Sequence, residues 1–193
     1  GLGDVYKRQE VKPSSISTEE IIKMNPSGII LSGGPETVTI SSSQKVHKSL
    51  LEAKIPILGI CYGMQTIAKE LGGSVVNSDV REFGHAEISH VNKSVLFDSV
   101  NFDSNNLDVW MSHGDKVDKI PENFEIIASS KDCKVAGFQN LDSNLFGLQF
   151  HPEVTHTNQG EKILSNFIFK VCGCSKNWST SDIINSMIFD VKN

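Results

Sequence analysis

The segment IPILGICYGMQ, residues 55–65, constrains the fold most strongly because it changes from strand to helix within a few residues. Its apolar run IPILGI has the length and composition of a buried strand. Directly after this run, apolar residues recur with the helical spacing i, i+3, i+4 and i+7, at Met64, Ile67, Ala68 and Leu71. The pattern predicts a strand, a tight turn and a helix, which is the repeating unit of α/β proteins. Cys61 lies at the turn.

The other segments predict an α/β sheet that also contains an antiparallel section. Ser17 and Glu20 form a capping box for a short helix that Asn25-Pro26 ends. A buried strand at 29–31 and a helix near 46–51 precede the strand of IPILGI. Short β segments separated by turns then follow: AEISHV (86–91), SVLF (94–97), VWMS (109–112), EIIASS (125–130), VAGFQ (135–139) and LFGLQF (145–150). Amphipathic helices at 163–171 and 183–191 end the pattern. We therefore predict an open, mostly parallel sheet flanked by helices, with a smaller antiparallel β section.

Charge and cysteine content exclude several classes of protein. The formal net charge of −5 gives no electrostatic basis for binding nucleic acid or a membrane surface. No apolar run approaches the roughly 20 residues that a membrane-spanning helix needs. The four cysteines, Cys61, Cys133, Cys172 and Cys174, are spaced neither as a disulfide framework nor as a paired CxxC zinc site. We expect no metal site, and a reducing, cytoplasmic setting.

The turn around Cys61 has the spacing of a nucleophile elbow, in which small residues flank a reactive side chain on both sides. Gly59 and Gly63 allow the backbone to bend sharply, because neither carries a Cβ atom. The N-terminus of the following helix then directs amide groups toward the thiol, which favours a thiolate and later an oxyanion. Burial as a small apolar side chain is an equally good interpretation of this segment taken alone.

His151 is the best candidate for the base that a cysteine nucleophile requires. It follows the apolar strand LFGLQF, and ligands of open α/β sheets gather beyond the carboxyl ends of strands. Glu153, two positions later, can accept a proton from the second ring nitrogen. Taken alone, His-Pro-Glu is an ordinary surface turn, but beside the cysteine elbow it favours a catalytic group. The SGGP turn at 32–35 adds glycine amides that could bind a developing negative charge.

Five motifs in order carry a resemblance to a known family: LSGGPE, LGICYGMQ, REFGHAE, WMSHGDKV and LQFHPEVTHT. Together they resemble the class I glutamine amidotransferases, and SHGDKV and HPEVTHT are most similar to the glutaminase domains of GMP synthetases. The resemblance covers about 10–178 and implies a flavodoxin-like α/β fold. Family members begin with an apolar strand and a helix ahead of the region of Glu10, so we expect this chain to lack the first strand and helix.

The resemblance also implies roles for individual residues. Cys61 is expected to attack the side-chain amide carbon of glutamine, with His151 as acid and base and Glu153 orienting His151. The remaining expected residues are the backbone amides of Gly34 and Tyr62 as an oxyanion hole, and Gln65, His113 and Gly114 as substrate contacts. No metal or cofactor is expected in this domain.

The resemblance further implies a larger enzyme, a glutamine-hydrolysing ligase. Residues 1–9 are predicted to be a non-native scar, 10–174 the amidotransferase domain, and 175–193 a linker and the start of an ATP-pyrophosphatase domain. That synthetase domain, absent here, is expected to bind ATP and magnesium and to use the ammonia to aminate XMP to GMP. The expected partners are glutamine and this synthetase domain of the same chain, with a homodimer as the full-length state and no nucleic-acid or membrane partner.

Two other functions remain open at this point. A stand-alone thiol hydrolase or peptidase of related fold could use Cys61 and His151 and release its product to water. A non-catalytic binding or regulatory subunit could retain the fold alone, although intact Cys61, His151 and Glu153 argue against this.

Overall fold

The computed structural model describes residues 9–34, 37–38 and 46–175. The predicted scar at 1–9 and the predicted linker at 175–193 therefore lie almost wholly outside the described residues, and the predicted helix at 183–191 lies wholly outside them. These assignments stay predictions.

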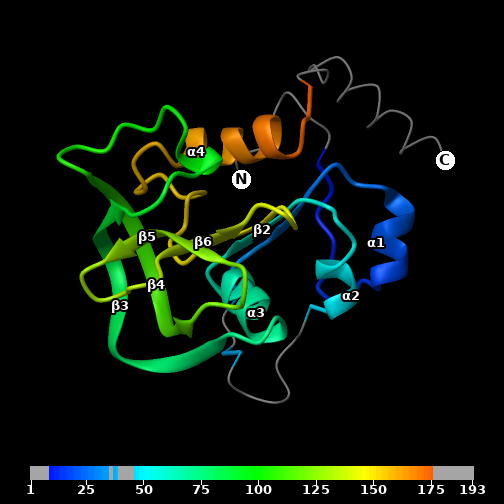
Figure 1. Ribbon diagram of the computed structural model, residues 1–193, viewed down its shortest axis with the longest axis horizontal. Coiled ribbons are helices and arrows are strands. Elements are labelled where there is room, and N and C mark those ends of the chain that lie inside the picture. The colour runs from blue at the N-terminus through cyan, green and yellow to red at the C-terminus, as the bar shows by residue number, and fades with distance from the viewer. Residues whose placement is uncertain (1–8, 35–36, 39–45, 176–193) are drawn as a thin grey trace.

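A seven-stranded mixed sheet forms the centre of the described structure, in the order β1-β2-β7-β6-β5-β3-β4 (Figure 1). The strands are β1 Ile29–Leu31, β2 Ile57–Ile60, β3 Ser74–His90, β4 Asn106–Lys119, β5 Glu125–Ser130, β6 Gly137–Asn140 and β7 Leu145–Leu148. Strands β1, β2 and β7 pair in parallel, and the other pairs are antiparallel. The predicted α/β fold is confirmed, but the prediction of a mostly parallel sheet with a smaller antiparallel section is wrong for the described residues. Two of the six strand pairs are parallel and four are antiparallel, because the two longest strands, β3 and β4, pair in the antiparallel section, which continues the parallel one edge to edge.

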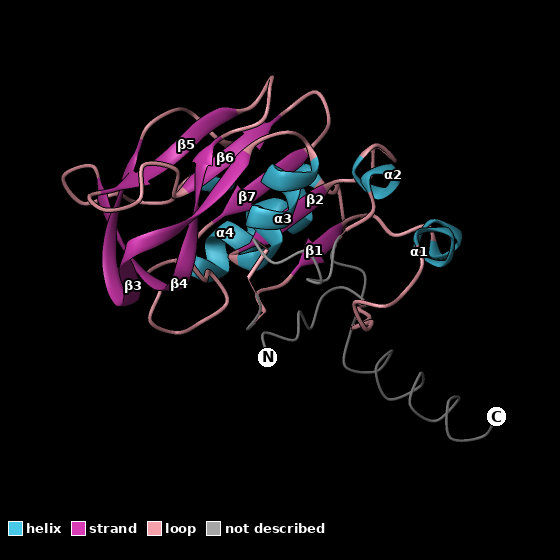
Figure 2. Ribbon diagram, turned by 90° about the horizontal axis from the view of Figure 1, so that it is seen from below, coloured by secondary structure: helices cyan, strands magenta, loops and turns pink. Residues whose placement is uncertain are grey.

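Helices cover both faces of the parallel part of the sheet (Figures 1 and 2). The helices on the faces are α3 Tyr62–Glu70 and α4 Gly160–Asn166, which continues as the π-helical η2 Phe167–Val171, whereas α1 Thr18–Met24 and α2 Lys48–Leu51 lie beyond β1 (Figure 2). Ile57 of β2 packs in one apolar cluster with Met64 of α3, and its neighbour Leu58 packs in the other with Ile163 of α4. Because successive side chains of a strand point to opposite faces, α3 and α4 cover opposite faces of the sheet. None of the helices in the described residues is long and apolar enough to cross a membrane.

The first helix and first strand form where the local sequence predicts them. Ser17 caps α1: its Oγ accepts a hydrogen bond from the Glu20 amide, and the Glu20 carboxylate accepts one from the Ser17 amide, both at 3.2 Å. Asn25 ends the helix in the left-handed conformation, with φ 48°. The predicted strand at 29–31 is β1, residue for residue.

The segment SVLF is a correction, because residues 94–97 do not form the predicted β segment. They form a 3₁₀ helix, η1 Val95–Phe97. Ser94 Oγ accepts a hydrogen bond from the Leu96 amide at 3.2 Å, and both Leu96 and Phe97 are buried. A four-residue apolar run suits a strand or a helical turn equally well, and a preceding serine that caps the turn favours the helix.

Candidate active site

Cys61 lies between β2 and α3, at the point where the chain reverses. Its backbone has φ 52° and ψ −106°, a conformation that a residue with a side chain adopts only under strain. The amide of Cys61 donates a hydrogen bond to the carbonyl oxygen of Leu148 at 2.7 Å, which ties the turn to β7. The thiol is buried, and its Sγ lies 3.5 Å from the carbonyl oxygen of Ser112. The turn therefore has the geometry of a nucleophile elbow.

The two glycines of the elbow are required by close backbone packing. A Cβ atom on Gly59 would lie 2.6 Å from the carbonyl carbon of Gly63, and one on Gly63 would lie 2.2 Å from the carbonyl oxygen of Leu31. Both distances are shorter than side chains tolerate. The Gly-x-Cys-x-Gly spacing thus reflects the close approach of α3 to β1 and β2.

His151 reaches the same edge of the sheet from β7. Ile60 and Leu148 are paired in the parallel register of β2 and β7, so the carboxyl ends of both strands lie together. The amide of His151 donates to the carbonyl oxygen of Trp110 at 3.0 Å, which holds this loop against β4. The Nδ1 atom of His151 lies 2.7 Å from Glu153 Oε1, a hydrogen bond between the ring and the carboxylate.

The imidazole of His151 and the side chain of Cys61 meet beside the turn that follows β1. A Cβ atom on Gly33 would lie 3.0 Å from His151 Cε1 and 3.7 Å from Cys61 Cβ. His151 Nε2 is buried and has no well-formed hydrogen bond. Even so, the interaction with Cys61, followed by the hydrogen bond to Glu153, raises the pKa of His151 to about 10. The ring is therefore an imidazolium at neutral pH.

The two expected oxyanion-hole residues lie next to each other. A Cβ atom on Gly34 would lie 3.7 Å from Cγ of Tyr62, an ordinary contact. Tyr62 is the first residue of α3, so its amide belongs to the helix N-terminus beside Cys61. Their role as oxyanion donors stays a prediction.

The side chain of Gln65 is buried and engaged within the protein. Its Nε2 donates to the carbonyl oxygen of Asp115 at 2.8 Å and to Gln149 Oε1 at 3.2 Å. Gln65 therefore joins α3 to β4 and to the end of β7. Its expected contact with substrate stays a prediction.

His113 and Gly114 lie on β4, directly after Ser112, whose carbonyl oxygen faces Cys61. The His113 side chain is buried against Glu82 of β3, with His113 Nε2 3.1 Å from Glu82 Oε2. The main chain of this stretch therefore contacts Cys61 at Ser112, and the resemblance implies a role for the main chain here. Substrate binding by this main chain stays a prediction.

Gln149 is a site residue that the sequence analysis missed. It is fully buried, and its Nε2 donates toward Cys61 Sγ at 3.6 Å. The signal that could have found it was a polar residue inside the apolar strand LFGLQF, because a buried amide needs a hydrogen-bond partner.

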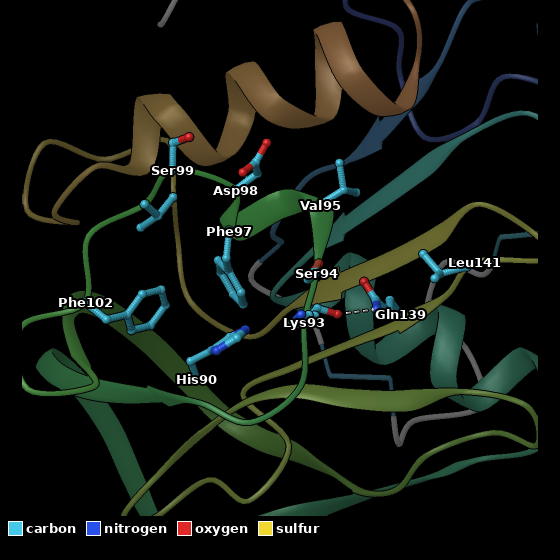
Figure 3. Close-up of a pocket in the computed structure, with 11 residues that line it drawn as sticks. His90, Lys93, Ser94, Val95, Phe97, Asp98, Ser99, Phe102, Gln139 and Leu141 are labelled. Carbon is cyan, nitrogen blue, oxygen red and sulfur yellow. Dashed lines mark hydrogen bonds between the residues drawn. The ribbon is translucent and has the colours of Figure 1, made fainter.

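A separate hollow of about 530 Å³ lies between η1 and β6 (Figure 3). Its lining includes His90 and Phe102, whose ring centroids are 5.5 Å apart. It also includes Gln139, whose Nε2 donates to the carbonyl oxygen of Lys93 at 2.9 Å. It contains none of the predicted site residues. The candidate active site is therefore defined by the strand ends, and not by this hollow.

Known proteins share both the sequence and the fold. The family model of class-I glutamine amidotransferases matches residues 2–171. GMP synthase [glutamine-hydrolyzing] of Ruthia magnifica subsp. Calyptogena magnifica is 48% identical over 184 residues, which is 95% of this chain and 35% of that protein. The protein of the same name from Pseudomonas entomophila is 46% identical over 188 residues, 95% of this chain and 36% of that protein. The chain thus spans about a third of the length of these relatives.

Among solved structures, a putative GMP synthase subunit from Thermoplasma acidophilum has a TM-score of 0.72 at 31% identity. The match covers 85% of this chain and 80% of that one. Since the family model spans most of the chain and close relatives share its sequence and fold, the chain belongs to the class-I glutamine amidotransferase family.

Proposed function

We propose that this chain is the glutaminase domain of a GMP synthase and hydrolyses glutamine to glutamate and ammonia. The observation that carries the proposal is the meeting of Cys61 and His151 beside Gly33, with Glu153 hydrogen-bonded to the far side of the ring. The resemblance to GMP synthases over 95% of the chain supports glutamine as the substrate.

In the first half-reaction, Cys61 Sγ attacks the side-chain amide carbon of glutamine. The amide oxygen becomes an oxyanion, which the backbone N–H groups of Gly34 and Tyr62 bind; removing one such donor typically costs roughly 3 kcal/mol of barrier. The imidazolium of His151 then gives its Nε2 proton to the leaving ammonia, and a glutamyl thioester remains on Cys61.

In the second half-reaction, the neutral ring of His151 accepts a proton from water. The hydroxide attacks the thioester carbon, the C–S bond breaks, and the Cys61 thiolate is restored beside an imidazolium. The side-chain carboxylic acid formed in this step loses its proton to solvent and leaves as glutamate. Glu153 remains hydrogen-bonded to Nδ1 throughout and balances the charge of the ring.

The further steps of the proposal belong to a larger enzyme. Ammonia released here passes to a synthetase domain that binds ATP and magnesium and aminates XMP to GMP. A homodimer of the full-length enzyme and a cytoplasmic location are part of the same proposal. The names and lengths of the relatives support it, since the chain matches about a third of each.

A glutamine-analogue electrophile tests the proposed chemistry on the chain itself. We expect covalent labelling at Cys61, mapped by peptide mass spectrometry, and slower labelling when glutamine is added. The three other cysteines are internal controls, because Cys133, Cys172 and Cys174 lie outside the elbow. The matched control variant Cys61→Ala should take up no label.

Other outcomes would favour the alternative functions. Absence of label on Cys61 in the folded chain favours a non-catalytic binding protein. Labelling that glutamine does not slow favours a thiol hydrolase of another substrate. The coding sequence beyond Asn193 gives an independent test: an ATP-pyrophosphatase domain with a glycine-rich SGGxDS-type loop supports the synthetase proposal, and its absence favours the stand-alone hydrolase.

A further inference from the structure

A second group of chemically reactive side chains, none of them a candidate catalytic residue, lies in the antiparallel section of the sheet, near enough to His151 for its charge to act on His113. It consists of Glu82, His113 and Cys133, and one ligand atom from each residue lies within 4.8 Å of the others. Glu82 and His113 are directly paired in the register of β3 and β4, and Cys133 lies in the connection between β5 and β6. Three segments distant in sequence thus converge at one buried point.

Three polar atoms of this group lack the partners that burial normally demands. Glu82 Oε2 and both ring nitrogens of His113 are buried without a well-formed hydrogen bond among the described residues, although the backbone of Asp115 lies close enough to interact with the ring. The His113 side chain is 1% exposed. His113 Nε2 and Glu82 Oε2 are 3.1 Å apart, yet their contact lacks hydrogen-bond geometry. Because unpaired buried polar atoms are costly, the arrangement indicates a missing third participant.

The spacing suits a metal ion as that participant. Zinc binds nitrogen and carboxylate oxygen at about 2.0–2.2 Å in a tetrahedral shell, which separates two ligand atoms by roughly 3.3 Å. The separation of 3.1 Å between His113 Nε2 and Glu82 Oε2 is close to this value. A mixed nitrogen, sulfur and oxygen donor set is typical of zinc, whereas calcium and magnesium prefer oxygen donors.

Ser130 holds two members of the group in position. Its hydroxyl donates to Glu82 Oε1 at 3.3 Å and accepts from the Cys133 amide at 2.9 Å. One carboxylate oxygen of Glu82 is thereby oriented, which leaves the other directed at His113. Such supporting hydrogen bonds to ligand residues are a regular feature of metal sites.

The charges around the group are mixed, because the Glu82 carboxylate attracts a cation whereas the positive charges of Lys116 and His151 act on His113 and oppose one. The His113 side chain is 1% exposed, and a neutral imidazole offers a nitrogen lone pair to a metal. The Cys133 thiol donates a hydrogen bond to the carbonyl oxygen of Val135 at 3.3 Å, so metal binding must break this bond and release the thiol proton to solvent. Lys116 and Asp132, of opposite charge, both act on Glu82 and offset each other.

We infer that Glu82, His113 and Cys133 form a binding site for a divalent transition metal. The nitrogen, sulfur and oxygen donors of the site indicate Zn²⁺. The ion bonds to the Cys133 sulfur, His113 Nε2 and Glu82 Oε2, releases the thiol proton, and leaves a fourth position for water. It joins β3, β4 and the β5–β6 connection. Because Ser112, next to His113, contacts Cys61 through its carbonyl oxygen, the ion also stabilises the strand that borders the candidate active site.

Cobalt substitution tests this inference on the 193-residue chain, stripped of metal with a chelator. All variants carry Cys61→Ala as their background, because this substitution removes the thiol of the Cys61, His151 and Glu153 group as a competing ligand. Titration with Co²⁺ should give one equivalent bound, with a sulfur-to-cobalt charge-transfer band and intense tetrahedral visible bands. Zn²⁺ should bleach this spectrum and raise the melting temperature.

The variant that removes the sulfur ligand is Cys133→Ser, and its matched control is Cys172→Ser, a half-buried cysteine outside the group. We expect Cys133→Ser to abolish the charge-transfer band and weaken Co²⁺ binding at least about tenfold. Cys172→Ser should retain both the band and the affinity.

A second variant, Glu82→Gln, keeps the size of the side chain and its hydrogen bond from Ser130. It should also weaken Co²⁺ binding, and it provides the test if Cys133→Ser fails to fold. Circular dichroism establishes that each variant is folded. A folded background chain that binds no Co²⁺, or whose charge-transfer band survives in Cys133→Ser, would overturn the inference.

Discussion

At the scale of single residues, the backbone strain at Cys61 is the central feature. A side chain at positive φ costs on the order of 1–3 kcal/mol, and such strain persists only where the surroundings enforce it. Here the hydrogen bond from the Cys61 amide to Leu148 and the close packing at Gly59 and Gly63 enforce it. The strained turn places the side chain of Cys61 beside the ring of His151, next to Gly33.

Gly33 is predicted to be more sensitive to substitution than Gly34. In Gly33→Ala the new Cβ would lie 3.0 Å from His151 Cε1, so the ring must move relative to Cys61, whereas in Gly34→Ala the nearest atom is 3.7 Å away. We expect Gly33→Ala to slow labelling of Cys61 by roughly ten- to a hundredfold, because small misplacements of reacting groups are costly. An equal or larger loss in Gly34→Ala would contradict the prediction.

The ionisation of His151 is predicted to depend on Cys61. The pKa of His151 is raised to about 10, so the protonated ring is present at neutral pH and is lost as the pH rises through about 10. Cys61→Ala should shift the titration midpoint down, because the interaction with Cys61 is the largest cause, and Glu153→Gln should shift it down less. NMR titration of the ring signals measures this, with His151→Gln assigning the signal. A wild-type midpoint near the ordinary histidine value of about 6.5 would count against the pairing.

Gln149 is predicted to support both the fold and the thiol. Gln149→Met removes the donor facing Cys61 Sγ and the oxygen that accepts from Gln65. We expect the free energy of unfolding to fall by about 1–3 kcal/mol, measured by urea denaturation, and labelling of Cys61 to slow. The exposed Gln9→Met serves as control and should stay within about 0.5 kcal/mol of wild type. Equal stability of the two variants would exclude the structural role.

At the scale of elements, the contact of α3 with the parallel strands determines the site. The start of α3 lies against the carbonyl of Leu31 at the end of β1, so its N-terminal amides and Cys61 face the turn at Gly33 and Gly34. Strands β1, β2 and β7 end at the same edge because they run parallel. His151, a few residues after the end of β7, therefore lies close to the thiol of Cys61.

Gly63 is predicted to be essential for this contact. A Cβ atom in Gly63→Ala would overlap the carbonyl oxygen of Leu31 at 2.2 Å, and neither group can move without displacing α3 or β1. We expect the free energy of unfolding to fall by about 1–3 kcal/mol or more. Chemical denaturation measures the loss. A variant as stable as the wild-type chain would show that the elbow does not depend on this approach.

At the scale of the whole molecule, the sheet separates two apolar clusters. Leu58 and Phe146 face the cluster beneath α4, whereas Ile57 and Leu145 face the cluster beneath α3. Figure 2 shows α1 and α2 beyond β1, at the end of the sheet away from β3 and β4. Each strand of the parallel section thus contributes to both cores, which fixes its register.

Phe146 is predicted to contribute far more to stability than an exposed phenylalanine. Phe146 is 1% exposed and lies against Phe167, whereas Phe83 of β3 is 66% exposed. We expect Phe146→Ala to lower the free energy of unfolding by about 3–5 kcal/mol through the cavity that it leaves. Phe83→Ala should change it by no more than about 0.5 kcal/mol. Urea denaturation of both variants measures the difference, and similar losses would contradict the two-core description.

Part of the fold and the site could be predicted because it depends on neighbours in sequence. The capping box of α1, the strand β1 and the elbow at Cys61 follow from spacing within a few residues. The position of His151 at the same sheet edge as Cys61 could be predicted because ligands of open α/β sheets gather beyond the carboxyl ends of the strands. The strand predicted at SVLF was wrong because four apolar residues suit either structure, and the cap by Ser94 favours the helical turn.

Local sequence was sufficient for the α/β fold, the turn at Cys61 and its strand-end partner, since periodicity and glycine spacing carry that information. Three contacts became known only from the folded chain: Gln149 faces the thiol, the His113 side chain faces Glu82, and Cys133 joins this pair. These contacts join residues separated by tens of positions, and their geometry depends on strand register and burial. No local pattern records either quantity.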